Sequence, residues 1–243
     1  MNTTVRGFPN LHALSRAAAA ASCTIINQAV RSHGRCSIAL SGGTTPRLLY
    51  SCFAEPAYAE KIPWDRLHIF WGDERCVPPD LPESNYRLAW EPWLSKVPIP
   101  AAHIYRMQGE LADPAAAASA YEDTLRSFFD SGSPSRPGFD LVLLGLGNDG
   151  HTASLFPGDA ALAEHTRLVR AVTAPPQYET RQRLTLTLPA LCTAAHILFL
   201  ISGRDKQPVL EHILNNRAEA VKRYPAARVA AQIELGWLIN EGA

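Results

Sequence analysis

The chain has no excess of charge of either sign, because 23 lysines and arginines are balanced by 23 aspartates and glutamates among 243 residues. Proteins that hold nucleic acid or an anionic membrane surface through a general positive field carry a basic excess, and none is present here. We therefore expect no nucleic-acid partner and no membrane partner. A small anionic ligand is still compatible with this balance, since it needs only two or three local cations.

Cysteine is also scarce: the five cysteines are widely spaced and form no Cys-x-x-Cys pair. This spacing argues against a disulfide framework and a structural zinc site, so we expect reduced thiols, no bound metal and a cytoplasmic location. No apolar stretch is long enough to span a bilayer. The alanine-rich run at 17–21 could imitate a signal peptide, but the apolar residues from Leu11 to Ile25 share one helical face, which favours an amphipathic first helix.

Internal repeats are absent, and the segment 131–138 has the composition of a loop rather than of a domain linker, so we interpret 1–243 as a single domain. Short apolar runs alternate with helical patterns, which predicts an α/β domain with a mostly parallel sheet. The expected strands are 36–40, 67–71, 103–107, 139–144, 168–172, 184–188, 197–201 and 235–239. The expected helices after the first are 46–53, 85–94, 115–129 and about 206–214.

In sheets of this kind, ligands bind beyond the carboxyl ends of the strands, which directs attention to loops 41–45, 72–76, 145–152 and 202–206. In the first loop, Gly42 and Gly43 allow close backbone approach, and Thr44 or Thr45 can cap the next helix with Pro46 in its first position. Free N–H groups at a helix start attract anions. The pattern favours phosphate or sugar contact, although an ordinary strand-to-helix turn would also fit.

Cationic side chains occur in two of the other loops. Arg75 follows Asp73 and Glu74 and could hold a phosphate through two donors, or the three residues could form a solvated turn. Lys206 stands at a helix start, where its charge opposes the helix dipole, so an anion-binding role competes with that of a surface lysine. Arg183, beside an expected strand, is a weaker candidate. Ser84 is expected only to cap the helix that follows it.

The remaining loop, 145–152, follows the most apolar expected strand and literally matches Gly-x-Gly-x-x-Gly. A dinucleotide site would require a helix packed closely behind the last glycine and an acidic residue about 20 positions on, where Arg170 stands instead. Asp149 and His151 form an Asp-x-His pair, in which the carboxylate could set the tautomer of a histidine that acts as a general base on water. Metal ligation is disfavoured, because no second and third ligand follow at suitable spacing.

Taken in order, these motifs resemble those of the 6-phosphogluconolactonases, in the family that also contains glucosamine-6-phosphate deaminases. The resemblance rests on segments 40–46, 71–78 with Ser84 and Asn85, 145–158, 183–189 and 202–206, and it covers nearly the whole chain. The run Gly-His-Thr-Ala-Ser-Leu-Phe-Pro at 150–157 is its most specific part. The resemblance implies a Rossmann-like three-layer fold of the deaminase type.

The resemblance also implies an activity: hydrolysis of 6-phosphogluconolactone to 6-phosphogluconate in the oxidative pentose phosphate pathway, by a monomer or homodimer without metal or organic cofactor. The only partner implied is the small phosphorylated sugar lactone. His151 would activate water, Arg75 and Lys206 would hold the phosphate, and the remaining residues would line or support the site. These are Gly42, Gly43, Thr44, Asp73, Asp149 and Arg183.

Three alternatives remain open from the residues. A glucosamine-6-phosphate deaminase or isomerase would share the phosphate loops and could use Asp73 as a base near C2. An NADP-dependent dehydrogenase would use the glycine-rich loop for its cofactor. A non-catalytic sugar-phosphate sensor would normally carry a DNA-binding segment, for which the chain has neither spare length nor a basic helix.

Overall fold

A parallel sheet of six strands forms the centre of the computed structural model, which describes residues 2–130 and 138–242. The strand order is β1-β9-β8-β5-β2-β3, and every neighbouring pair is parallel. The bounds are Asn2–Phe8 for β1, Cys36–Leu40 for β2, Leu67–Trp71 for β3, Leu141–Leu144 for β5, His196–Ser202 for β8 and Glu234–Asn240 for β9. Strands β2 and β5 are buried along their whole length, as expected of central strands covered on both faces.

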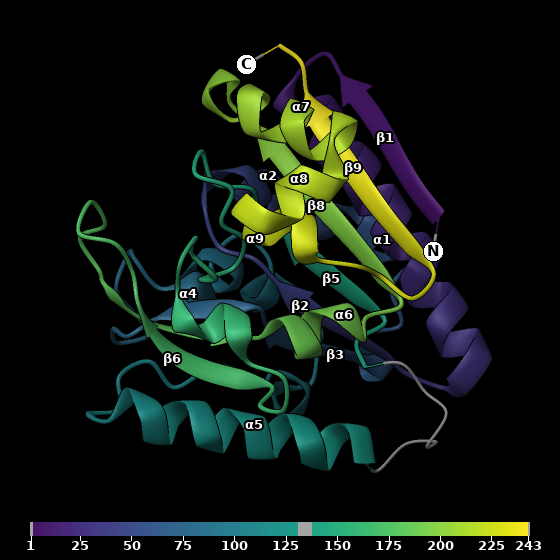
Figure 1. Ribbon diagram of the computed structural model, residues 1–243. Helices are drawn as coiled ribbons and strands as arrows, with labels where there is room; N and C mark the ends of the chain where they lie inside the picture. The colour runs from purple at the N-terminus through teal and green to yellow at the C-terminus, as the bar shows by residue number, and fades with distance from the viewer. Residues whose placement is uncertain (1, 131–137, 243) are drawn as a thin grey trace.

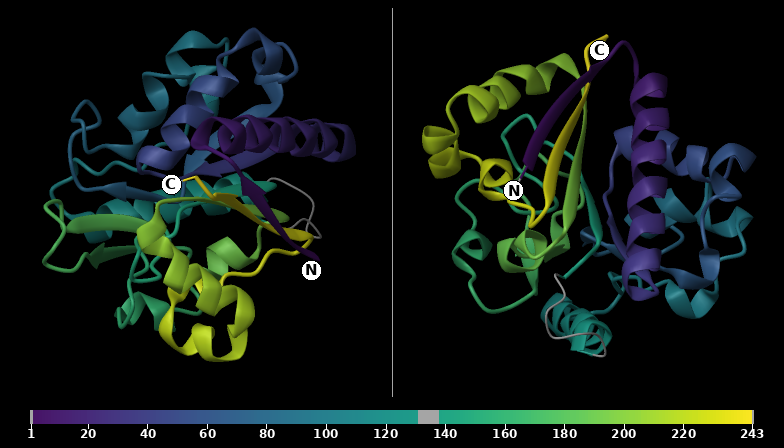
Figure 2. Two further views of the ribbon diagram at one scale, coloured as in Figure 1. Left: turned by 90° about the horizontal axis from the view of Figure 1, so that it is seen from above. Right: turned by 90° about the vertical axis from the view of Figure 1, so that its right-hand side faces the viewer.

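Helices cover both faces of this sheet and complete a three-layer α/β fold. Figure 2 shows the sheet between α1 (Leu11–His33) on one side and α7 (Gln207–Asn215), α8 (Arg217–Arg223) and α9 (Pro225–Arg228) on the other. The Asn10 side chain caps the start of α1 by accepting from the Ala13 N–H at 2.8 Å, and Gly34 ends the helix in the left-handed conformation. The amphipathic first helix is confirmed, because Leu14, Ala18 and Ile25 of its apolar face are buried. On the described ranges, no helix combines the length and the apolar character needed to cross a membrane.

A second, smaller sheet is antiparallel and has the order β4-β7-β6. Its strands are Asp73–Arg75 (β4), Gln182–Leu186 (β7) and Val169–Thr173 (β6). The long helix α5 (Pro114–Asp130) lies along this sheet at the bottom of Figure 1. Two of the expected strands, 168–172 and 184–188, therefore belong to this separate sheet rather than to the parallel one.

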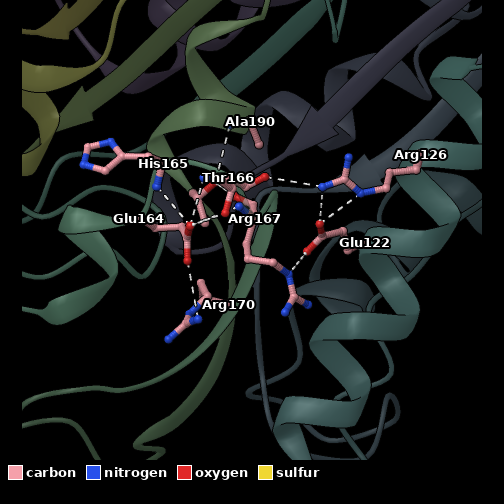
Figure 3. Close-up of polar contacts among 9 residues, drawn as sticks. Glu122, Arg126, Glu164, His165, Thr166, Arg167, Arg170 and Ala190 are labelled. Carbon is pink, nitrogen blue, oxygen red and sulfur yellow. Dashed lines mark hydrogen bonds and ion pairs between the residues drawn. The ribbon is translucent and has the colours of Figure 1, made fainter.

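An ion pair between Glu122 and Arg167 fastens α5 to the turn before β6, as Figure 3 shows. Glu122 on α5 is buried, and its two carboxylate oxygens accept from Arg126 and Arg167 at 2.5 and 2.6 Å. Glu164 orders the turn before β6, because one of its oxygens accepts from the backbone N–H groups of residues 165, 166 and 167. The position of the second sheet thus depends on a small set of charged contacts as well as on apolar packing.

The remaining elements differ from the sequence-based expectation at several points. The expected strand 103–107 is wrong: a 3-10 turn covers Ala101–His103, and only Ile104 forms an isolated bridge, with Ile69. The segment 72–76 contains strand β4 instead of being entirely loop. Helix α4 spans Asn85–Trp90 and is shorter than expected, although Ser84 does cap it by accepting from the Arg87 N–H. The expected loop 131–138 falls, up to residue 137, outside the described residues.

Helix α2 (Thr44–Phe53) also begins earlier than expected. Its N-cap is Gly43, with no side-chain cap, so neither Thr44 nor Thr45 has the capping role that the sequence suggested, and Pro46 is the third residue of the helix instead of the first. Gly43 has φ of +96°, a conformation that disfavours any residue with a side chain. The remaining helices are α3 (Pro56–Ala59) and α6 (Leu188–Cys192).

Candidate active site

The four loops that follow β2, β3, β5 and β8 meet at one cavity of about 340 Å³ at the carboxyl edge of the parallel sheet. Eight of the nine residues expected from the sequence line it: Gly42, Gly43, Thr44, Asp73, Arg75, His151, Arg183 and Lys206. The ninth, Asp149, is not among the lining residues and contacts His151 from behind. The structure therefore brings together residues that are more than 160 positions apart in the chain.

The loop after β5 holds His151 and Asp149 in contact. Asp149 Oδ1 lies 2.6 Å from His151 Nδ1 and also accepts from the backbone N–H of His151 at 3.0 Å. Burial alone would raise the pKa of Asp149, but the hydrogen bonds from His151 outweigh it and the pKa is lowered. An ionised carboxylate can only accept, so the proton on this side of the imidazole sits on Nδ1 and Nε2 is left with a free lone pair.

The backbone around this pair forms a closed turn. The Gly147 N–H donates to the carbonyl of His151 at 2.9 Å, and the Thr152 hydroxyl donates to the carbonyl of Gly145 at 2.8 Å. The next helical element after β5 is the 3-10 turn Ala160–Ala163, so no helix starts behind the last glycine. A dinucleotide-binding loop needs that helix, and the NADP-dependent alternative loses its structural basis.

Asp73 also lines the cavity and is buried. Its Oδ2 accepts from the Ser154 hydroxyl at 2.7 Å, and its Oδ1 accepts from the Asn85 side-chain amide at 3.2 Å. Both oxygens are therefore occupied, which fixes the orientation of the carboxylate. Nothing in the sequence indicated that the Ser154 hydroxyl would be a partner of Asp73.

Glu74, the neighbour of Asp73, has a structural role. Its buried carboxylate accepts from the backbone N–H groups of Arg75, Asn85 and Tyr86 and from the Ser84 hydroxyl. Burial raises the pKa of Glu74, while these backbone donors oppose the rise. The side chain joins β4 to the start of α4 and so places both Asp73 and Arg75 at the cavity.

Three cations line the cavity: Arg75, Arg183 and Lys206. Arg183 is buried, and its pKa is lowered first by burial and then by the positive charge of Arg75. Burial also lowers the pKa of Lys206, and within the described ranges this side chain forms no ion pair or hydrogen bond. The repulsion between like charges beside one cavity would be relieved by an anion, so the three side chains are of the kind that a multiply charged oxyanion requires.

An aromatic wall completes the cavity and was not expected from the sequence. Tyr178, in the loop between β6 and β7, places its hydroxyl 3.3 Å from His151 Nδ1. Phe156 packs against the imidazole at 4.9 Å between ring centroids and against Tyr178 at 5.3 Å. Phe156 belongs to the Ser-Leu-Phe-Pro run, but nothing in the residues around Tyr178 indicates that their loop reaches His151.

Groups of three or more histidine, cysteine, aspartate or glutamate side chains arranged to hold a metal ion do not occur in the described part of the chain. The cavity itself is lined by a histidine paired with a carboxylate, by a second carboxylate of fixed orientation, and by three cations.

Comparison with known proteins places this arrangement among relatives. The family model described as "Glucosamine-6-phosphate isomerases/6-phosphogluconolactonase" matches residues 9–237. A 6-phosphogluconolactonase from a Nostoc species is 39% identical over 243 residues, which is 100% of this chain and 98% of that protein.

Solved structures agree with the sequence comparison. The crystal structure of 6-phosphogluconolactonase from Thermotoga maritima has a TM-score of 0.83 at 30% identity, covering 99% of this chain and 100% of that one. A monomeric glucosamine-6-phosphate deaminase, at 20% identity and a TM-score of 0.80 over 98% of both chains, shares the fold. The expected three-layer α/β fold of the deaminase type is therefore confirmed.

Proposed function

The chain belongs to the glucosamine-6-phosphate isomerase/6-phosphogluconolactonase family, and from this premise we propose that it hydrolyses 6-phospho-D-glucono-1,5-lactone to 6-phospho-D-gluconate in the oxidative pentose phosphate pathway. The observation that carries the proposal is the contact of 2.6 Å between His151 and Asp149 at a cavity lined by three cations. In this proposal the chain acts as one domain, as a monomer or homodimer in the cytoplasm, without metal or cofactor.

His151 is the general base. The Nδ1–H group keeps its proton and donates a hydrogen bond to Asp149. Nε2 accepts a proton from water as the water oxygen attacks the lactone carbonyl carbon. Collapse of the tetrahedral intermediate breaks the bond from that carbon to the ring oxygen, which takes a proton back from the imidazolium. Asp149 stabilises the imidazolium between these two proton transfers. It contacts His151 but does not line the cavity, which suits a role that acts on the histidine and not on the substrate.

The cations hold the phosphate at the other end of the substrate. Arg75, Arg183 and Lys206 supply the positive charge, and Gly42, Gly43 and Thr44 at the start of α2 bring backbone N–H groups to the same wall. Binding energy from the distant phosphate orients the lactone against the water and the histidine. Asp73, held by Ser154 and Asn85, is placed as a fixed acceptor for a sugar hydroxyl.

The decisive test supplies freshly made 6-phosphogluconolactone and records acid release in a pH-stat above the spontaneous rate. We expect His151→Ala to lower kcat/KM by about 100-fold or more, the usual effect of losing a general base. His165→Ala, at an exposed position outside the cavity, is the matched control and should behave as wild type. A wild-type rate no faster than the background, or full activity in His151→Ala, contradicts the proposal.

The phosphate site has its own test, a comparison of the phosphorylated lactone with glucono-1,5-lactone. We expect Lys206→Ala and Arg75→Ala each to raise KM for the phosphorylated substrate roughly 10- to 100-fold, as for the loss of a charge-assisted hydrogen bond, and to leave KM for the unphosphorylated lactone nearly unchanged. Lys222→Ala, an exposed lysine paired with Glu219, serves as the control. If the preference for the phosphorylated lactone persists in both cavity variants, these residues do not bind the phosphate.

A further inference from the structure

Tyr178 is a second polar neighbour of the histidine, and the reaction proposed above gives it no part. Its hydroxyl lies 3.3 Å from His151 Nδ1, the atom that also lies 2.6 Å from Asp149. Its ring stands perpendicular to the imidazole, at 5.8 Å between centroids. Nδ1 carries one proton, and its stronger hydrogen bond is the shorter one, to the ionised carboxylate. The tyrosine oxygen is therefore placed as the second acceptor of the same N–H.

The loop that carries Tyr178 is held by its own hydrogen bonds. The Tyr178 N–H donates to the carbonyl of Pro175 at 3.1 Å, and Arg183 Nε donates to the carbonyl of Thr180 at 2.7 Å. The Arg183 guanidinium also lies 5.9 Å from the centre of the Tyr178 ring. One of the three cavity cations thus supports the loop that places a hydroxyl at the histidine.

The hydroxyl is neutral where it lies. Burial raises the pKa of Tyr178, and the negative charge of Asp149 raises it further. A neutral phenol presents a lone pair to Nδ1–H and keeps its own proton. Such a dipole stabilises the imidazolium more than the neutral imidazole, because the positive charge strengthens the N–H donor.

We propose that Tyr178 is a positioning residue for His151: with Phe156 it fixes the plane of the imidazole, and through its hydroxyl it stabilises the protonated ring during the reaction. The inference rests on the proposed function, in which His151 is the base. Other charged groups contact this histidine or line the same cavity, and they remain unchanged in the test. They are Asp149 on its own loop, Asp73 and Arg75 on β4, Arg183 on β7, and Asp205 and Lys206 in the turn before α7.

The test is Tyr178→Phe, which removes the hydroxyl and keeps the ring. Loss of a hydrogen bond to the cationic form lowers the pKa of the base. We therefore expect the acidic limb of the kcat/KM profile to move to lower pH by roughly half a unit, which is about a threefold change in the acid dissociation constant of the base. The plateau kcat should fall about threefold to tenfold, with KM nearly unchanged. Tyr178→Leu, which removes the ring as well, should lower kcat further.

Tyr58→Phe is the matched control, since its hydroxyl donates to the carbonyl of Arg16 on α1, away from the cavity. Titration of the His151 ring by NMR in the free protein gives a second readout that does not depend on turnover, and it should move in the same direction. An unchanged or upward-shifted acidic limb in Tyr178→Phe overturns the inference, as does an effect confined to KM. If His151→Ala is itself fully active, the proposed function fails instead, so the two failures are distinguishable.

Discussion

The contact between His151 and Asp149 depends on a third residue of the same loop, Gly147. A Cβ atom built on Gly147 would lie 2.0 Å from His151 Nδ1 and 2.7 Å from Asp149 Oδ1. No carbon approaches a ring nitrogen so closely, so any side chain here displaces the imidazole or separates the pair. The glycine that first suggests a nucleotide-binding loop is instead required by the histidine and aspartate.

Gly147→Ala tests this role. We expect kcat to fall about 100-fold, because a displacement of about 1 Å at a catalytic group is enough for such a loss. The matched control is Gly145→Ala on the same loop, where an added Cβ meets nothing within 4 Å, and its loss should be much smaller. Steady-state kinetics with circular dichroism as a check on folding decide the matter. Equal activity in the two variants would show that the loop adapts without moving the histidine.

At the scale of elements, apolar runs were reliable guides. Strands β2 and β3 have the bounds that the sequence predicted, because a central parallel strand is buried on both faces and its pattern is a continuous apolar run. Strand β1 was missed, since Asn-Thr-Thr-Val-Arg-Gly-Phe is polar, and as an edge strand it is mostly exposed. Strand β4 was missed because three charged residues pair with β7 only through a contact of high sequence separation.

In the candidate site, too, some residues could be predicted from local sequence patterns and others could not. The carboxyl ends of the parallel strands could be located from the strand pattern, and for that reason seven of the eight expected residues that line the cavity follow β2, β3, β5 or β8. The eighth, Arg183, lies on β7 of the antiparallel sheet. The contacts that Tyr178 and Ser154 make in the site could not be located. Tyr178, in the β6–β7 loop, contacts His151 across 27 positions of the chain, and the pairing of Ser154 with Asp73 joins residues 81 positions apart. Local patterns carry no information about either contact.

The molecule as a whole places its chemistry between two sheets. The parallel sheet supplies the loops with His151 and Lys206, and the antiparallel sheet supplies Asp73, Arg75 and Arg183. The geometry of the cavity therefore depends on how firmly the second sheet is held. Helix α5 packs on β6 and β7, and its buried Glu122 joins it through Arg167 to the turn before β6.

Glu122→Gln tests the contribution of this junction to stability. Burial alone would raise the pKa of Glu122, but the hydrogen bonds and charges of Arg167 and Arg126 outweigh it, and the pKa is lowered. A carboxylate with a lowered pKa in the folded state stabilises the protein above its unfolded pKa of about 4.3, and this stabilisation is lost as the pH falls through the lower folded value. Since both arginines are partly exposed, we expect the variant to lose about 1–2 kcal/mol of unfolding free energy at pH 7.

Urea unfolding at pH 7 and at several values below 4.3 measures this difference. The gap between wild type and Glu122→Gln should narrow with falling pH, because wild-type Glu122 then becomes neutral like the glutamine. Glu219→Gln, which removes an exposed carboxylate paired with Lys222, should change stability by less than about 0.5 kcal/mol at any of these values. Neither residue lines the cavity, so activity should be unchanged in both variants at urea concentrations well below the unfolding transition, where the second sheet is still folded against the first. A gap between Glu122→Gln and wild type that is the same at every pH would mean that packing, and not the charge on Glu122, holds α5 against the second sheet.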